Sequence, residues 1–247
     1  MFEKTLFMFS LCTTALLIPL TSSAHEDTDT QKSVEFTATA TIATDYMFRG
    51  ISQTLNDPAV HAAFDVSHTS GLSAGVWSSN VDSQDRGPFD DQSDQEIDIY
   101  IGYGTSLNEY WMVDATAIRY IFPGTASDTD LDWNELLIGV HFREYVSLLI
   151  GYSNKVFNLD DPGIYYGLSG NLPLSHNTRL TASLGYYDLD DALNDSYMDW
   201  SAGAEADMGM FTARLAYIEA DNHADTLFGL DKADGRILFS LMAAFGE

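Results

Sequence analysis

The sequence has a single cysteine, Cys12, and few basic residues. Cys12 lies within the first 24 residues, so the rest of the chain cannot depend on the disulfides that hold small secreted domains together. Lysine and arginine number 11 against 37 aspartate and glutamate residues, which gives a net charge of -26. A charge of this sign argues against binding to nucleic acid or to an anionic membrane surface.

Apolar runs long enough for a membrane helix are missing as well. Residues 1–24 combine a basic residue, Lys4, with an apolar stretch from Thr5 to Leu20 and small residues up to Ala24. This stretch is shorter than the ~20 apolar residues of a spanning helix, so it predicts a secretory signal peptide that is removed on export. Residues 25–33 are expected to form a polar lead-in, and residues 34–247 a single domain.

What the sequence does contain, from Val34 onward, is apolar and polar residues in alternation. Even positions from Val34 to Ile42 are apolar, while Glu35 and three threonines occupy the odd positions. Such a period of two indicates a strand with one apolar and one polar face. Twelve segments of this kind can be counted, and they start near residues 34, 58, 72, 95, 110, 131, 145, 163, 178, 197, 210 and 235.

The connections between these segments alternate between long and short. An even number of strands joined in this way is typical of an outer-membrane barrel. The sequence therefore predicts an all-β fold, a single antiparallel transmembrane β-barrel of about 12 strands with short periplasmic turns and long acidic outer loops. A soluble periplasmic β-sandwich is the alternative. Against it, globular strands average ~5–6 residues, and these segments are near the ~9–11 that span a membrane.

Aromatic residues gather at the ends of the predicted strands, where amphipathic rings favour the membrane interface. They are Tyr46, Phe48, Tyr103, Tyr110, Trp111, Tyr145, Tyr152, Tyr186, Trp200, Tyr217 and Phe245. In the segment TDYMFRGISQT, residues 44–54, the alternation of the first strand continues, so Tyr46 and Phe48 are expected to point outward. Asp45 and Arg49 are then expected in the lumen, paired with each other or with groups across the pore.

The same region resembles a known family. The segment DYMFRGISQTLNDPAVHAAFDVSHTSGLSAGVWSSNV, residues 45–81, is similar to the opening block of the TorF-type porins, a bacterial family of otherwise unknown function. The resemblance continues through EIDIYIGYG, RYIFPG, YYDLDD, YMDWSAG and the closing DGRILFSLMAAF. It implies an outer-membrane barrel and a channel, and it supplies neither a substrate nor catalytic residues.

Charged residues on the polar faces fall into two groups. The acidic group comes from the first half of the chain and consists of Glu35, Asp45, Asp65, Glu96, Asp98, Asp114 and Glu135. The basic group comes from the last four strands, with the first strand beside them after closure, and consists of Arg49, Arg179, Arg214 and Arg236. Facing arcs of opposite charge would set a field across a narrow lumen. The alternative is a set of salt bridges that plugs the barrel.

An acidic outer loop adds to this pattern. Asp90, Asp91 and Asp94 are expected to form part of a negative mouth, which would raise the local concentration of cations and favour cation passage. This loop lacks the ordered spacing of an EF-hand, and the six histidines lack the spacing of metal ligands. We therefore expect no metal and no cofactor.

A hydrolase site was also considered. His68 and Ser70, with Asp65 upstream, are the best candidate, because a Ser–His pair is the core of acyl-hydrolase sites. The favoured interpretation is a polar hairpin turn that contains glycine and has a histidine at its edge. We therefore expect no catalytic residues.

These observations predict a channel in the outer membrane of a Gram-negative bacterium, reached by export through the periplasm. Because a barrel of this strand number is narrower than an open porin, the expected cargo is ions or very small solutes, with cations preferred. The alternatives are a structural or surface-interaction barrel with a plugged lumen and, less favoured, an outer-membrane lipid hydrolase. The expected partners are outer-membrane lipid and lipopolysaccharide, the transported ions or solutes, and the barrel assembly machinery, with no nucleic acid.

Overall fold

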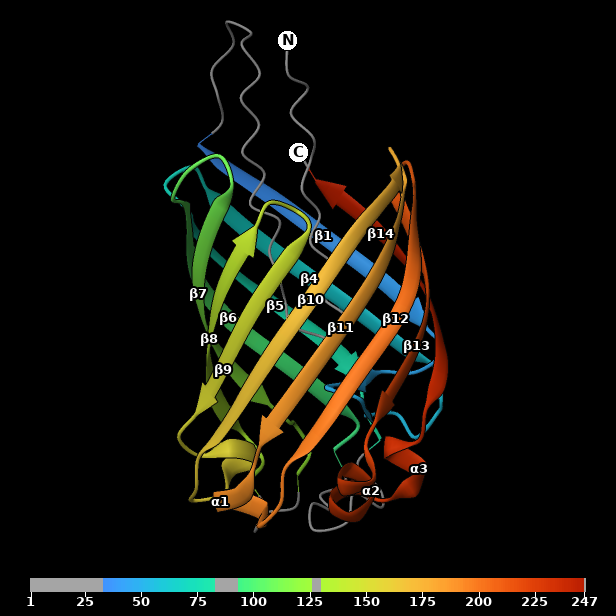
Figure 1. Cartoon of the computed structure of the whole chain (residues 1–247). Coiled ribbons are helices and arrows are strands. Elements are labelled where there is room, and N and C mark those ends of the chain that lie inside the picture. Colours follow the sequence, from blue (N-terminus) through green and yellow to red (C-terminus); the bar gives the residue numbers. More distant parts are fainter. Residues whose placement is uncertain (1–32, 83–92, 126–129, 247) are drawn as a thin grey trace, which may run out of the picture.

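Twelve strands, paired in antiparallel order, close into the barrel of Figure 1. The computed structural model describes residues 33–82, 93–125 and 130–246. Within these ranges the wall strands are β1 (Val34–Ala43), β4 (Ala59–His68), β5 (Leu72–Asn80), β6 (Gln95–Ser106), β7 (Trp111–Ile121), β8 (Trp133–Phe142), β9 (Val146–Ser153), β10 (Gly163–Ser175), β11 (Thr178–Asp188), β12 (Tyr197–Met208), β13 (Phe211–Ala220) and β14 (Arg236–Gly246). The predicted fold class is confirmed. The largest offset from a predicted start is that of β8, which begins at Trp133 rather than near 131.

The wall closes between its first and last strands. Thr39 of β1 lies opposite Ala244 of β14 on one side and opposite Ala63 of β4 on the other. Because each described wall strand has a partner on both sides, its backbone groups are paired within the barrel and present no edge to another chain.

The outer face of the wall is apolar and the inner face is polar. On β6, Ile99 is 53% exposed whereas Asp98, the residue before it, is 1% exposed. Each wall strand contributes exposed large apolar side chains in this way. Arg119 of β7 lies on the outer side, where its guanidinium is 3.1 Å from the Asp132 carboxylate.

Nine of the eleven aromatic residues named at strand ends are exposed. They are Tyr103, Tyr110, Trp111, Tyr145, Tyr152, Tyr186, Trp200, Tyr217 and Phe245. The prediction is wrong for Tyr46 and Phe48, because β1 ends at Ala43 and the chain then turns into the barrel. Tyr46 is 1% exposed and packs against His61 and Trp77 of neighbouring wall strands.

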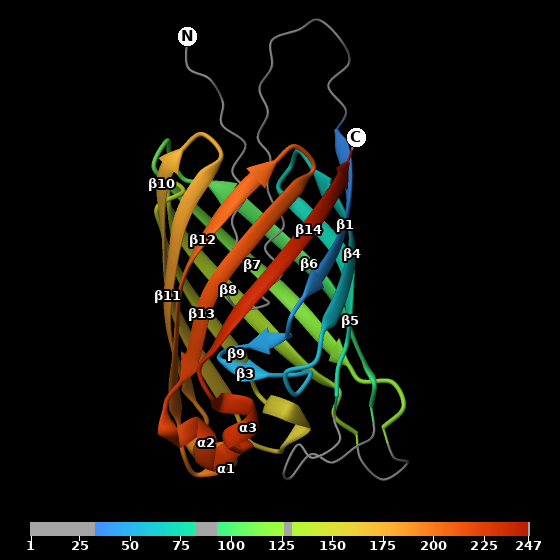
Figure 2. The ribbon, with the colours of Figure 1, turned by 90° about the vertical axis from the view of Figure 1, so that its right-hand side faces the viewer.

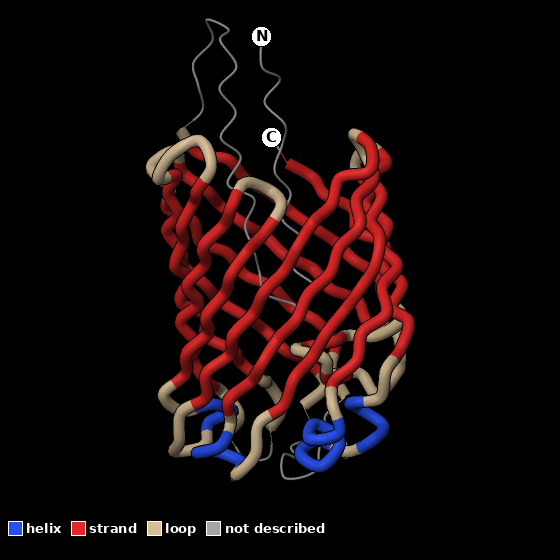
Figure 3. Tube along the Cα trace, viewed as in Figure 1, coloured by secondary structure: helices blue, strands red, loops and turns tan. Residues whose placement is uncertain are grey.

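The two ends of the barrel differ, as Figure 3 shows. We call the end with the short connections the turn end and the opposite one the loop end. The helices of the described residues lie at the loop end: η2 (Val156–Asn158), α1 (Asp190–Leu193), α2 (Asn222–Phe228) and α3 (Leu230–Ala233). Asp221 caps α2 by accepting hydrogen bonds from the backbone of His223 and Ala224, which satisfies donors that a helix start leaves open. Among the described residues, none of the helices has the length and apolar character of a membrane-crossing helix.

A small hairpin lies inside the barrel, as Figure 2 shows. It consists of β2 (Met47–Phe48) and β3 (Ile51–Ser52), which form a separate sheet in the connection between β1 and β4. This hairpin was not predicted. It sets the position of the candidate site, because it places the residues of 44–54 in the lumen rather than on the wall.

Candidate functional site

Arg49, at the tip of the hairpin, reaches the far wall of the barrel. Its Nη2 atom donates to both carboxylate oxygens of Glu135 on β8, each at 2.8 Å. The side chains are 3% and 1% exposed. Tyr120 of β7 donates a further hydrogen bond of 3.0 Å to Oε2 of Glu135. A charge-assisted contact of this kind is stronger than a neutral hydrogen bond, and here it holds the hairpin across the lumen.

Aromatic rings enclose the same guanidinium group. Its central carbon lies 4.7 Å from the ring centre of Phe48, 4.2 Å from that of Tyr165 and 4.5 Å from that of Tyr187. A cation–π contact is worth about 2 kcal/mol or more when it is desolvated. Tyr197 of β12 also donates a hydrogen bond of 3.0 Å to the backbone carbonyl of Arg49. Side chains of β10, β11 and β12 therefore hold the tip from one side, while Glu135 holds it from another.

The turn of the hairpin has unusual backbone geometry. Arg49 and Gly50 both have positive φ angles, of 48° and 80°, as a two-residue type I′ turn requires. For arginine this conformation costs about 1–3 kcal/mol, so the contacts of its side chain must offset it. At Gly50 a Cβ atom would lie 2.7 Å from Cβ of Asp199, so glycine fits here by both conformation and space.

The base of the hairpin is tied to the last wall strand. Asp45 accepts hydrogen bonds from Ser52 at 2.7 Å and from Thr54 at 2.8 Å. Its second oxygen lies 2.8 Å from Arg236 of β14, which also donates to Asn56 at 2.6 Å. The sequence left open whether Asp45 and Arg49 pair with each other or with groups across the pore. The structure shows the second arrangement, because Asp45 pairs with Arg236 and Arg49 with Glu135.

The other acidic residues named from the sequence are distributed over the inner wall. Glu96 and Asp98 are buried on β6 beside the hairpin, and one carboxylate oxygen of Asp98 has no hydrogen-bond partner within the described residues. Asp65 accepts a hydrogen bond from Tyr100. Glu35 is half-buried near the turn end of β1.

Asp114 belongs to a small buried chain of polar groups nearer the turn end. Its carboxylate lies 2.5 Å from Nε2 of His141, and Nδ1 of His141 lies 2.8 Å from the Ser147 hydroxyl. His141 is thus held in the inner wall by these two contacts. Among the described residues, no group of three or more side chains is suited to hold a metal ion.

The basic residues of the last strands are paired locally. Arg179 lies 2.5 Å from Glu205 and 2.7 Å from Asp207, both on the adjacent strand β12, and Arg214 lies 3.6 Å from Glu205. Much of the charge of this arc is therefore neutralised by its own neighbours. The expected separation into an acidic and a basic arc is reduced accordingly.

Two further expectations concern the ends of the barrel. Asp90 and Asp91 lie outside the described residues, while Asp94 is exposed at the start of β6. At the turn end, Nδ1 of His68 lies 2.8 Å from the Ser70 hydroxyl and also accepts from the Ser70 backbone at 3.1 Å. These are contacts within a turn, and Asp65 is engaged by Tyr100 instead.

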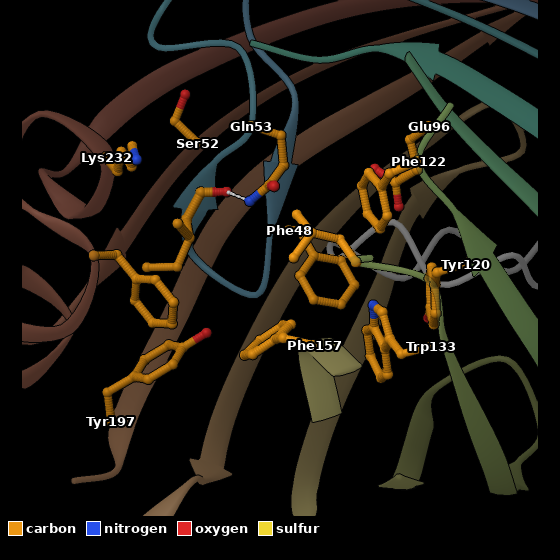
Figure 4. A pocket seen from close by; sticks show the side chains of 13 residues that line it. Phe48, Ser52, Gln53, Glu96, Tyr120, Phe122, Trp133, Phe157, Tyr197 and Lys232 are labelled. Atoms are coloured by element: carbon orange, nitrogen blue, oxygen red, sulfur yellow. Dashed lines mark hydrogen bonds between the residues drawn. The ribbon is translucent and has the colours of Figure 1, made fainter. Parts of the chain in front are cut away.

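An aromatic pocket opens beside the hairpin at the loop end, as Figure 4 shows. Its cavity volume is about 80 Å³. The rings that line it come from the hairpin, three wall strands or their ends, and two helical segments: Phe48, Tyr120, Phe122, Trp133, Phe157, Tyr197 and Phe228. Glu96, Lys232, Ser52 and Gln53 are the polar residues among its lining.

Sequence reasoning missed this pocket and the rings around Arg49, although a signal for the latter was present. Of the aromatic residues in two tyrosine doublets it named Tyr186 alone, and it did not ask which rings the alternation sends into the lumen. In the doublets 165–166 and 186–187, Tyr166 and Tyr186 are exposed, whereas Tyr165 and Tyr187 are buried in the lumen. A pair of adjacent tyrosines in a strand necessarily sends one ring to each face.

The loop end also holds an ion pair outside the wall. Nδ1 of His223, in α2, lies 2.9 Å from Asp195, which precedes β12. The hydrogen bond with Asp195 raises the pKa of His223, and the nearby negative charge adds to this effect. The same hydrogen bond, together with one from the backbone of Ser196, lowers the pKa of Asp195. This pair links α2 to the connection between α1 and β12.

Comparison with known proteins supports the architecture. A family described as bacterial protein of unknown function (Gcw_chp) matches residues 27–245. No curated protein matches by sequence. Among solved structures, the KdgM porin is similar over 85% of this chain and 99% of its own, with a TM-score of 0.52 and 6% identity. The NanC porin is similar over 85% and 98%, with a TM-score of 0.53 and 8% identity. At these identities the similarity establishes the fold alone.

Proposed function

The chain belongs to the Gcw_chp family of bacterial proteins of unknown function, and we propose that it is a narrow outer-membrane channel for ions or small solutes. A closed barrel with an apolar outer face and aromatic side chains near the strand ends is suited to a bilayer, because each backbone group is paired within the wall. The proposed location is the outer membrane of a Gram-negative bacterium. Lipid and lipopolysaccharide would then surround the wall, and the barrel assembly machinery would insert it.

Two similarities support a channel. The solved structures with the same fold include proteins named as porins, KdgM and NanC. The resemblance of residues 45–81 to the TorF-type porins points in the same direction. Neither names a solute for this chain.

The observation that carries the proposal is the hairpin inside the lumen. A loop held across a barrel by Arg49 and Glu135 narrows the path and leaves room only for small cargo. A channel for large solutes would need a lumen free of such an element. The polar groups of the inner wall beside the hairpin are acidic, with Glu96 and Asp98 buried on β6.

We further propose that cations pass more readily than anions. The net charge of the chain is -26, and the arginines on β11 and β13 are already paired with acidic residues of β12. A lumen and mouth with excess negative charge concentrate cations and repel anions.

A second candidate is a plugged barrel without transport. It is favoured by the tight enclosure of Arg49, which is 3% exposed and contacts three rings. Planar-bilayer recording on the refolded parent protein separates the two. The channel proposal expects small, discrete current steps, whereas a complete absence of current from correctly folded protein would favour the plugged barrel.

A further inference from the structure

The aromatic pocket at the loop end has the features of a site for a positively charged group. Its rings form a continuous series of contacts. Tyr120 stacks on Trp133 with centroids 4.2 Å apart, Trp133 meets Phe157 edge-on at 5.5 Å, and Phe157 meets Phe228 at 6.3 Å. Phe228 in turn meets Tyr197 at 5.7 Å. The faces of aromatic rings attract cations through the ring quadrupoles, and methylated ammonium groups are the ligands that aromatic cages recognise.

Negative charge lies on one side of this pocket. Glu96 lines the pocket next to Phe122 and is 4% exposed. One position deeper on the same face of β6 lies Asp98, which is 1% exposed and has a carboxylate oxygen with no hydrogen-bond partner within the described residues. Asp98 also shares a side-chain hydrogen bond with Glu96, so the two carboxyl groups hold a proton between them and one negative charge remains at this side of the pocket.

Positive charge lies on the other side. Lys232 of α3 lines the pocket across from Glu96, beside Ser52, as Figure 4 shows. A bound cation is therefore expected at the Glu96 side, away from the Lys232 ammonium. An anion would meet Glu96 and Asp98, and a sugar would need several polar partners where most of the lining is aromatic.

We propose that this pocket binds a small organic cation with a methylated ammonium group, which lies against the stacked pair of Tyr120 and Trp133 and beside the carboxylate of Glu96. The cavity of about 80 Å³ suits the head group of such a molecule rather than a large solute. The interpretation of this cation as a transported solute rests on the proposed channel function. Binding itself requires no transport.

Tryptophan fluorescence tests the proposal, because Trp133 is in the pocket and the other three tryptophans are not. A variant with Trp77→Phe, Trp111→Phe and Trp200→Phe leaves Trp133 as the reporter. Titration of the detergent-folded protein with choline is expected to give a saturable change in emission. The neutral molecule 3,3-dimethyl-1-butanol has the same shape without the charge, and it is expected to bind about ten-fold more weakly or not at all.

Variants then locate the site. Glu96→Gln is expected to lower choline affinity about ten-fold, while Glu35→Gln, which removes an acid near the turn end, leaves it unchanged. Equal affinity for choline and the neutral alcohol would overturn the proposal, since an apolar cavity alone would then explain binding. The absence of any saturable change with choline would overturn the proposal too. The comparison of choline with the neutral alcohol is made on protein that keeps Glu96, so it remains decisive even if Glu96→Gln does not fold.

The outcome is independent of conduction. Choline binding by a protein that passes no current would support the pocket and contradict the proposed channel. A conducting protein that does not bind choline would retain the proposed function and lose this inference.

Discussion

Arg49 and Glu135 are 86 residues apart in the chain and meet inside the barrel through two hydrogen bonds of 2.8 Å. One comes from the tip of a hairpin that follows β1, and the other from the opposite part of the wall on β8. Since both side chains are almost fully buried, each neutralises a charge that would otherwise be isolated from water. The contact is therefore expected to contribute to holding the hairpin in the lumen.

Loss of the Glu135 charge is expected to release the hairpin. In Glu135→Gln, Arg49 keeps its charge without a carboxylate, and leaving a buried charge unpaired costs up to about 3–5 kcal/mol. Moving the hairpin out of the lumen relieves this cost, so we expect larger single-channel conductance in planar bilayers. The matched control is Glu109→Gln, an exposed acid in a turn. If Glu135→Gln folds and its conductance equals that of the parent, the hairpin does not set the width of the path.

Substitution of Gly50 is expected to act in the same direction for a different reason. Ala at this position must adopt a φ of 80°, and its Cβ atom would press on Asp199. We expect Gly50→Ala to raise conductance and to lower the free energy of unfolding by about 1–3 kcal/mol.

Gly209→Ala is the control for backbone conformation alone. Gly209 also has a positive φ, of 69°, but no atom lies within 4 Å of the Cβ position. It should lower stability by about 1 kcal/mol and leave conductance unchanged. Equal effects of the two substitutions on conductance would contradict the role assigned to the close approach at Asp199.

Cation preference is expected to depend on salt. Reversal potentials in a KCl gradient should indicate moderate cation selectivity at low ionic strength, which fades as the screening length falls from ~30 Å at 0.01 M to ~3 Å at 1 M. The triple variant Asp90→Asn, Asp91→Asn and Asp94→Asn should lower selectivity without a change in folding. Anion selectivity at low salt would mean that Arg179, Arg214 and Arg236 control the narrowest point.

The ion pair at the loop end is expected to respond to pH. The pKa of His223 is raised, so its contribution to stability is present below the unfolded value of ~6.5 and is lost as pH rises through the folded value. The pKa of Asp195 is lowered, so its contribution is lost as pH falls below ~3.9. The pair should thus hold α2 best between these limits.

Histidine NMR titration of the protein in detergent checks this expectation. Asp195→Asn should lower the pKa of His223 toward its ordinary value. An unaltered His223 titration in this variant would exclude the contact with Asp195 as the cause.

The wall of the barrel could be predicted because its signal is local. Alternation fixes which residues share a face, and strand starts follow from it closely. The hairpin could not be predicted from this signal, because residues 44–54 keep the same alternation as β1 and the pattern does not say where the wall ends. Its position depends on contacts such as that of Arg49 with Glu135, which no nearby residue indicates. The pocket depends on the hairpin, so it was missed with it.

The hairpin is attached to both the first and the last strand of the wall, and this has a consequence for assembly. The hairpin follows β1 directly, and Asp45 at its base binds Arg236 of β14. These two strands are the first and the last of the wall, and they become neighbours when the sheet closes on itself. The contact between Asp45 and Arg236 therefore requires closure, and a sheet that is still open lacks it. Closure of the wall and attachment of the hairpin base to β14 are therefore coupled in this chain.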